Sequence, residues 1–222
     1  MIAREGLMII GGALVLTILF ILGAAKFDSR VLFVLSILTG LMTLFSAYFF
    51  RDPERSFQPE DNLLISPADG KIVLITRLDH HPHVGGPAIQ VSVFLNVFDV
   101  HINRIPTSGT IDYVTYHEGK FMAAYHDKAS LDNEQTEIGM TATNGHRLAF
   151  KQIAGLIARR IVCKLEPGQH VATGARFGLI KFGSRTDLIV PADSKILVTE
   201  GQRVKGAETV IGYLPVTGAA AP

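Results

Sequence analysis

The sequence is poor in cysteine and has almost no net charge. Its one cysteine, Cys163, excludes an internal disulfide and a cysteine-rich zinc site. Because Cys163 follows Ile161 and Val162, we expect a buried and unreactive thiol. Lysine and arginine number 21 against 20 aspartates and glutamates, so the chain has no excess of basic residues with which to bind nucleic acid. The composition therefore argues against nucleic acid as a partner.

Charged residues are also absent from two long apolar runs near the N-terminus, Leu7 to Ala25 and Val31 to Phe50. As helices, both runs are long enough to cross a hydrocarbon core of about 30 Å. The connection between them, Lys26 to Arg30, is short enough for a tight helical hairpin. A cleaved signal peptide would not explain the length of the first run or the second run so soon after it. We predict a membrane hairpin over residues 1–51, with spans at about 7–25 and 31–50.

The orientation of this hairpin is set less clearly by the sequence. Lysine and arginine are nearly balanced around the spans, so the positive-inside rule gives little. Two spans place the N-terminus and everything after Phe50 on the same side. We expect the cytoplasmic side, because disulfide chemistry is absent. Tyr48 to Phe50 would form an aromatic belt at the interface, with Arg51 and Arg55 facing lipid headgroups.

After the hairpin, short apolar runs alternate with glycine, proline, asparagine and aspartate, and helix-length periodic segments are scarce. Residues 153–160 are the one stretch where a short helical turn is expected. Strands are expected over residues 71–75, 89–95, 109–116, 136–143, 147–153, 160–164, 178–182, 188–190 and 194–198. Residues 52–222 are therefore predicted to form a mostly β catalytic domain, either a barrel or a sandwich.

One short pattern occurs twice in this region. Gly168 to Val171 reads Gly-Gln-His-Val, Gly201 to Val204 reads Gly-Gln-Arg-Val, and each leads through further glycine to an apolar strand. Paired units of this kind resemble the barrel-sandwich of biotinyl and lipoyl carriers. Neither copy presents the lysine that such carriers modify, and the nearest lysines are Lys195 and Lys205. The resemblance therefore extends to the architecture alone.

Three stretches gather polar groups beside predicted strands. Residues 66–70 place Asp69 in a turn directly before a strand. Residues 94–106 begin as an apolar strand and end in Asp99, His101, Asn103 and Arg104; the first three would share one face if the strand continued that far. Residues 127–134 are dense in polar groups. Individually, each stretch is explained as a solvated loop.

A Gly183-Ser184 pair interrupts an otherwise strand-like stretch from Lys181 to Pro191. Glycine leaves its carbonyl unshielded, and the hydroxyl of the next residue can reach that carbonyl. On its own the pair is most simply interpreted as a bulge or a tight bend.

Taken together, these stretches resemble the short form of phosphatidylserine decarboxylase, a pyruvoyl-dependent enzyme that forms phosphatidylethanolamine. The resemblance runs from Tyr48 to Leu214 and rests on five motifs in the same order: residues 48–55, 66–70, 98–106, 127–134 and 182–184. It implies that Ser184 Oγ attacks the Gly183 carbonyl, and that an acyl shift and elimination cut the chain into a β chain, 1–183, and an α chain, 184–222. Ser184 would become the pyruvoyl cofactor, with which the substrate amine forms a Schiff base.

The resemblance also implies roles for individual side chains. Asp69 matches the acid of an Asp–His–Ser arrangement for self-cleavage, and His101 matches a base for that step and an acid or base in turnover. Longer relatives carry a second histidine where this chain has Arg104, which cannot act as a base at neutral pH. The base for self-cleavage is therefore left open, and Asp99 is a candidate to orient His101.

A second group is expected to bind the substrate: Arg104, through a phosphate or carboxylate, together with Asn133 and Glu134. The expected partners are a phospholipid in the membrane and the α chain bound to the β chain, with a homodimer left open. A metal site at His80, His81 and His83, in a loop-like stretch, is the less favoured interpretation.

Two other functions remain open at this point. The same chemistry would serve another serine-headgroup lipid, of the archaetidylserine type. A non-enzymatic, membrane-tethered adaptor with a lipoyl-like domain would explain the spans and the repeated turn, but it would leave Gly183-Ser184 and Asp69 without a use.

Overall fold

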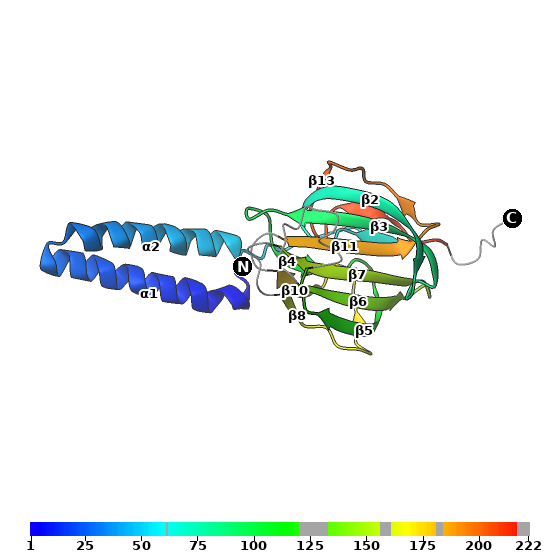
Figure 1. Cartoon of the computed structure of the whole chain (residues 1–222), viewed down its shortest axis with the longest axis horizontal. Coiled ribbons are helices and arrows are strands. Elements are labelled where there is room, and N and C mark those ends of the chain that lie inside the picture. The colour runs from blue at the N-terminus through cyan, green and yellow to red at the C-terminus, as the bar shows by residue number, and fades with distance from the viewer. Residues whose placement is uncertain (61, 120–132, 156–160, 181–183, 217–222) are drawn as a thin grey trace. The chain divides into compact units, whose positions relative to one another are not determined.

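A computed structural model describes residues 1–60, 62–119, 133–155, 161–180 and 184–216. The chain divides into two compact units, Met1–Glu54 and Arg55–Pro222 (Figure 1). Each unit is built from one kind of secondary structure, helical in the first and almost entirely β in the second.

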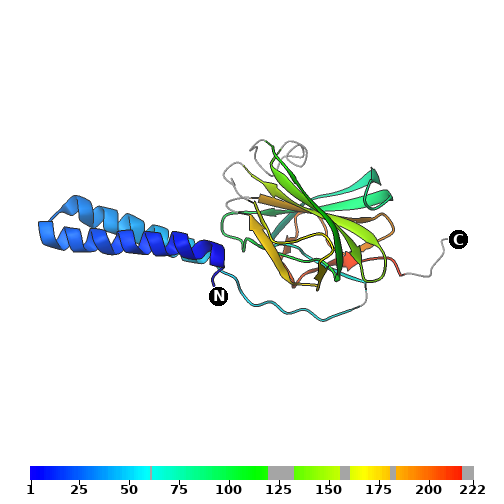
Figure 2. The ribbon, with the colours of Figure 1, turned by 90° about the horizontal axis from the view of Figure 1, so that it is seen from below.

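The first unit is a hairpin of two helices, α1 (Arg4–Phe27) and α2 (Arg30–Phe49), which lie side by side in Figures 1 and 2. The connection is short because α1 ends in a left-handed Asp28 and Ser29 caps α2, its hydroxyl accepting from Leu32 N at 3.4 Å. Most of the apolar side chains of both helices are exposed. Both helices are long and apolar enough to span a membrane, as predicted from the sequence.

The described residues of the second unit form fourteen strands. They are β1 (Leu63–Ile65), β2 (Gly70–His81), β3 (Gly86–Leu95), β4 (Ile102–Arg104), β5 (Gly109–His117), β6 (Gln135–Ala142), β7 (Arg147–Ala154), β8 (Ile161–Cys163), β9 (His170–Val171), β10 (Arg176–Ile180), β11 (Ser184–Pro191), β12 (Lys195–Ile196), β13 (Arg203–Val204) and β14 (Val210–Tyr213). The prediction of a mostly β domain behind two apolar helices is confirmed.

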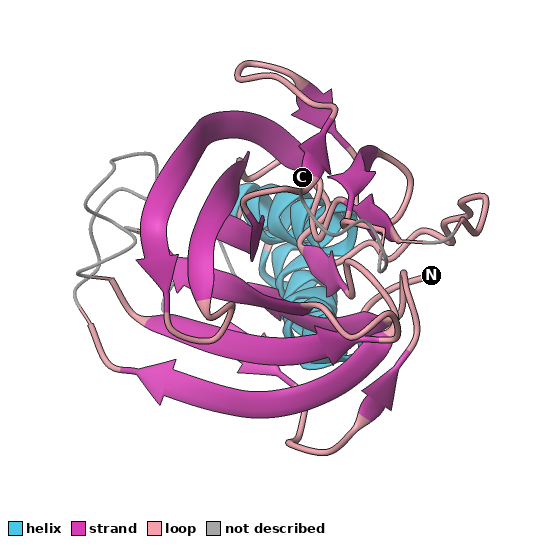
Figure 3. Ribbon diagram, turned by 90° about the vertical axis from the view of Figure 1, so that its right-hand side faces the viewer, coloured by secondary structure: helices cyan, strands magenta, loops and turns pink. Residues whose placement is uncertain are grey.

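Eight of these strands form one antiparallel sheet in the order β13-β2-β3-β11-β7-β6-β5-β9, and two three-stranded sheets complete the unit, β1-β14-β12 and β4-β10-β8. Figure 3 shows the long strands of the large sheet curling around the interior. The main core draws side chains from all three sheets, among them Leu64, Phe177, Leu188 and Ile211. The curl therefore gives the large sheet one face toward the core and one outward face.

The repeated Gly-Gln turn seen in the sequence is also a repeat of hydrogen bonds. Gly168 N donates to Ile111 O at 2.7 Å, and Ile111 N donates to Gln169 O at 2.9 Å. In the second copy Gly201 N donates to Ile72 O at 2.8 Å, and Ile72 N donates to Gln202 O at 2.9 Å. The two glutamine side chains each accept from the backbone three residues earlier. Both copies thus fold into the same turn. They precede β9 and β13, the two outermost strands of the large sheet.

Two of the predicted strands extend further than expected. β2 continues to His81, which pairs with Gly86, so His80 and His81 lie on a strand rather than in a loop. β11 begins at Ser184 rather than at residue 188, because both neighbouring strands pair with it from that point. The strand predicted over 147–153 is confirmed as β7, and residues 156–160 of the expected helical turn lie outside the described residues.

Cys163 lies on β8, where it is half-buried, and burial raises the pKa of its thiol. The thiol is therefore protonated at neutral pH and weakly reactive, as expected, although it is less buried than its neighbours predicted.

Candidate active site

Four neighbouring strands of the large sheet, β2, β3, β11 and β7, begin or end at the same side of the sheet. β11 begins at Ser184, which lies opposite Leu95, the last residue of β3, and opposite Ala154, the last residue of β7. β2 begins at the same edge, where Lys71 lies opposite Phe94 of β3. The end of β3, the end of β7 and the start of β2 therefore lie near Ser184, although they are far apart in the sequence.

Ser184 is fully buried, and its backbone pairs with the strands on both sides. Its pairing with β3 and with β7 continues to residue 189 without a shift in register, so the described part of this region contains no bulge. Gly183 lies outside the described residues. Among those that are described, none forms a hydrogen bond with Ser184 Oγ. A buried hydroxyl that lacks a partner is costly, which marks this position as one built for something other than stability.

A group of buried polar side chains lies on the same face of the sheet as Ser184. Thr186 is two residues along β11, and Gln152 pairs with it across β7. Gln152 Nε2 donates to Asn103 Oδ1 at 2.8 Å, and Asn103 Nδ2 lies 3.5 Å from Thr186 Oγ1. Gln152 Oε1 also has no hydrogen-bond partner in the described part of the chain. The part of this sheet face next to Ser184 is thus polar, whereas the rest of the face is apolar.

The segment that contains His101 is placed in the region of Ser184 by the residues at its two ends. Asn96 directly follows Leu95, the cross-strand neighbour of Ser184, and Asn103 contacts Thr186. His101 is buried, and its Nδ1 lies 2.9 Å from the backbone carbonyl of Asp99. Because a carbonyl only accepts, Nδ1 carries the proton, and the neutral ring has its lone pair on Nε2. His101 is therefore held in the tautomer that a base requires.

The expected role of the Asp99 carboxylate needs correction. Asp99 holds His101 through its backbone carbonyl, whereas its carboxylate accepts from Asn96 N at 2.9 Å and from Arg203 Nη2. The expected extended strand is confined to residues 102–104, because a turn at residues 96–99 interrupts it after β3. Asp99 and His101 therefore do not stand side by side on one strand face.

Asp69 immediately precedes β2. Its Oδ1 accepts from Gly206 N at 2.8 Å, and its Oδ2 lies 2.9 Å from Arg55 Nη2. The strand can start this close to β3 only because residue 70 is glycine: a Cβ on Gly70 would lie 2.2 Å from the carbonyl oxygen of Phe94. The turn thus fixes the Asp69 carboxylate in a polar cluster at the same edge of the sheet.

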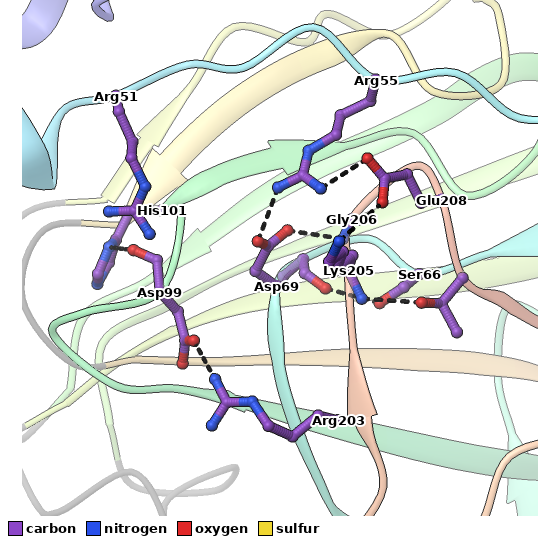
Figure 4. Close-up of polar contacts among 12 residues, drawn as sticks. Arg51, Arg55, Ser66, Asp69, Asp99, His101, Arg203, Lys205, Gly206 and Glu208 are labelled. Atoms are coloured by element: carbon purple, nitrogen blue, oxygen red, sulfur yellow. Dashed lines mark hydrogen bonds and ion pairs between the residues drawn. The ribbon is translucent and has the colours of Figure 1, made fainter.

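Figure 4 shows the two acids in separate groups, Asp69 with Arg55 and Gly206, and Asp99 with His101 and Arg203. Both groups include a residue from the C-terminal part of the chain, Gly206 in one and Arg203 in the other. The segment after Ser184 therefore supplies contacts to both predicted catalytic acids.

The predicted substrate-binding residues are divided. Asn133 Nδ2 donates to the carbonyl of Ala154 at 2.7 Å, and Glu134 O accepts from Ala154 N at 2.8 Å, so both reach the direct neighbour of Ser184. Arg104 Nη1 instead donates to Gly174 O at 3.2 Å, on the side of β4 opposite Asn103. The motif residues 127–130 lie outside the described residues.

The histidine-rich hairpin forms a different cluster. His81 Nε2 lies 3.9 Å from Glu137 Oε1, and burial lowers the pKa of His81. Burial would raise the pKa of Glu137, but hydrogen bonds from Lys151 and Tyr113 outweigh it and lower that pKa. His83 Nε2 pairs with Asp112 at 3.1 Å. His83 is thus paired with a carboxylate and His81 lies near one, and in the described ranges no three potential ligands gather for a metal.

Comparison with known proteins decides the family. The family model described as phosphatidylserine decarboxylase matches residues 42–212. The chain belongs to the phosphatidylserine decarboxylase family. A phosphatidylserine decarboxylase proenzyme of Desulfotalea psychrophila is 43% identical over 96% of both chains. That of Symbiobacterium thermophilum is 45% identical over 96% of both, and that of Chlorobaculum tepidum 48% identical over 76% of this chain and 77% of its own.

This membership confirms the resemblance and the prediction of an enzyme. It also argues against a non-enzymatic adaptor. Several site residues were not found from the sequence: Gln152, Thr186, Arg203 and Gly206. Arg55 was expected to face lipid headgroups, but its guanidinium binds Asp69 and Glu208. The one readable signal was Thr186, a polar residue on the same strand face as Ser184, where the following residues, Leu188 and Val190, are apolar. The others depend on which strands pair.

Proposed function

We propose that this protein decarboxylates phosphatidylserine to phosphatidylethanolamine after cutting its own backbone between Gly183 and Ser184. The observation that carries the proposal is Ser184 itself: a fully buried serine at the start of a central strand, whose Oγ has no hydrogen-bond partner among the described residues. The relatives named above are proenzymes, which are proteins that mature by processing. Their names specify phosphatidylserine rather than another serine lipid.

The first step belongs to Ser184. Its Oγ attacks the carbonyl carbon of Gly183, and the amide nitrogen leaves, so that residues 183 and 184 are joined by an ester. Loss of the Cα proton of residue 184 then breaks the ester. The β chain ends at Gly183, and residue 184 loses ammonia on hydrolysis to become a pyruvoyl group. A serine hydroxyl needs a base for the first attack. His101 is the proposed base, because its tautomer places the lone pair on Nε2.

The residues around position 184 fit a pyruvoyl group. The ladders to Leu95 and Ala154 hold the backbone on both sides, and Gln152, Thr186 and Asn103 offer polar atoms on the same face. When present, the pyruvoyl group supplies the electron sink that decarboxylation of an amino acid needs. His101 is proposed to deliver the proton that replaces the carboxylate.

Other side chains have positioning roles in the proposal. Asn133 and Glu134 are proposed to contact the serine headgroup, since they bind the residue opposite Ser184. Asp69, held by Arg55 and Gly206, is proposed as the fixed acid of the self-cleavage step, and Asp99 holds His101 through its carbonyl. Arg104 is not part of the proposed site, because its guanidinium binds the Gly174 carbonyl.

The two chains are proposed to stay together as one folded unit. The α chain, 184–222, supplies β11, β12, β13 and β14, of which β11 pairs with β3 and β7, β13 with β2 and β14 with β1. The two equivalent Gly-Gln turns support a barrel-sandwich architecture of paired hairpins, with one turn in each chain. The helical hairpin is proposed to lie in the membrane, with the catalytic unit on the cytoplasmic face.

Mass analysis of the full chain, purified in detergent and denatured, tests the proposal. We expect two chains with the masses of residues 1–183 and 184–222, the second with a carbonyl in place of its amine. The same preparation should release carbon dioxide from phosphatidylserine vesicles and not from free serine. A single intact chain in an active preparation would contradict self-cleavage, and a cut chain inactive on phosphatidylserine would contradict the substrate.

A further inference from the structure

A buried ion pair lies on the face of β11 opposite Ser184. Arg185 Nε donates to Asp187 Oδ1 at 2.6 Å, and Arg185 and Asp187 are both 0% exposed. The pair reaches across to β3, where Arg185 Nη2 donates to Ser92 Oγ at 2.7 Å. Gln90 Nε2 donates to Ser92 Oγ and to Asp187 Oδ2, each at 3.1 Å. Four polar side chains of two adjacent strands are thus joined in one buried network.

This network is an inefficient way to stabilise a sheet. Burying a guanidinium and a carboxylate costs much of what their attraction returns, and apolar side chains of similar size often serve as well. One donor group, Arg185 Nη1, has no hydrogen-bond partner in the part of the chain that is described, which adds to the cost. Further along the same face of β11, Ile189 packs in an apolar cluster with Ala88 and Ala149. The charges are confined to the end of the strand next to the proposed cut.

We propose that Arg185 and Asp187 anchor the new end of the α chain, and so keep residue 184 in place after the bond before it is cut. This inference rests on the proposed function, because it assigns a role that arises only once the backbone ends at residue 184. Arg185 is the second residue of the α chain, whereas Ser92 and Gln90 belong to the β chain. The network therefore joins the two chains directly behind the pyruvoyl position.

The need for such an anchor follows from the cut. Chain ends fray because nothing restrains them on one side, and a fraying first residue would move the group on which the chemistry depends. A displacement of about 1 Å at a reacting centre can cost about a hundredfold in rate. The ladders to β3 and β7 hold the backbone of residue 184, and the buried side-chain network fixes the strand one residue further on. Arg185 and Asp187 are thus positioning residues that do not touch the substrate.

The test compares the network in cut and uncut protein. The variants are Arg185→Met and the double change Arg185→Met with Asp187→Leu, which fills the same space without charge. Arg147→Met is the control, an exposed arginine at the far end of the neighbouring strand β7. All are made in the full chain, with and without Ser184→Ala to prevent the cut. Hydrogen exchange of residues 185–190 is measured by mass spectrometry, and kcat and KM are measured on phosphatidylserine vesicles.

In the cut double variant we expect exchange of β11 to be at least about tenfold faster than in the cut parent, and within about twofold of the parent in the uncut background. Its kcat per cut chain should fall by about ten- to a hundredfold, with KM nearly unchanged, because the headgroup contacts lie elsewhere. The single variant should show the same pattern with a lower Tm, since it removes the Arg185 charge and leaves the Asp187 carboxylate buried.

Other outcomes would contradict the proposed anchoring role of Arg185 and Asp187. Equal acceleration of exchange in both backgrounds would make the network an ordinary part of the fold, and parental exchange and kcat in the cut double variant would make it dispensable. A double variant that fails to fold or to be cut would place the network in folding. The intact mass of the parent is read separately: an uncut parent rejects the proposed function and the anchor together, whereas a cut parent with equal exchange rejects the anchor alone.

Discussion

Replacing Ser184 with alanine is expected to yield one uncut chain without decarboxylase activity. The change removes the only atom proposed to attack the Gly183 carbonyl, and with it the source of the pyruvoyl group. The fold should persist, because the backbone of residue 184 keeps both ladders and the lost hydroxyl has no hydrogen-bond partner within the described residues. Denaturing mass analysis and carbon dioxide release from phosphatidylserine vesicles measure the two expected losses.

The matched control is Ser194→Ala. Ser194 is also a buried serine whose Oγ has no hydrogen-bond partner among the described residues, and it lies beyond the other end of β11. It should be cut and active like the parent. A Ser184→Ala chain that is still cut before residue 184, or that still releases carbon dioxide, would rule out the proposed chemistry at this serine.

The sequence predicted the parts of the fold that depend on local patterns. Two uncharged apolar runs gave the helices, and alternation with turn residues gave most of the strands. The repeated Gly-Gln turn was visible because its geometry depends on glycine at positive φ and on a glutamine one residue later, both of which are local. The extents of β2 and β11 were predicted wrongly, because pairing with a distant strand decides where a strand ends.

The site divides in the same way. Ser184, His101 and Asp69 could be named from short motifs, because the chemistry requires those residue types. Their partners could not be named: Arg203 and Gly206 come from a segment remote in sequence, which the pairing of β13 with β2 brings to the acids, and no local pattern shows that Arg55 binds Asp69. Asp99 shows the limit most clearly. Its carboxylate suggested a partner for the His101 ring, but the backbone carbonyl makes that contact, and no sequence pattern distinguishes the two.

The position of the proposed cut has a consequence for assembly. Because β11 lies between β3 and β7 in the middle of the large sheet, the cut would turn a central strand into the first strand of a separate chain. Every hydrogen bond of β11 to its neighbours would then join two chains. The order of the strands therefore makes it unnecessary to reassemble the site after cleavage, because the sheet itself holds the α chain.

His101→Asn is expected to lower kcat per cut chain by about a hundred- to ten-thousandfold, the usual contribution of a general acid or base. Asparagine retains a donor near the position of Nδ1 and can still reach the Asp99 carbonyl, so it tests the proton at Nε2 rather than the support of the loop. His101→Ala removes both. If Nε2 is the working atom, the two variants should be equally slow while only the alanine variant loses stability, measured as Tm.

Self-cleavage must be scored apart from turnover in this experiment, because His101 is proposed to act in both. The fraction of cut chain is measured first by mass, and turnover is then expressed per cut chain. His146→Ala is the control, a partly buried histidine in the turn between β6 and β7, at the far end of the sheet. An asparagine variant that turns over at the parental rate per cut chain would leave His101 with a structural role only. If that variant is slow in turnover but fully cut, a different group must take the proton from Ser184, and Asp69 would become the first residue to examine.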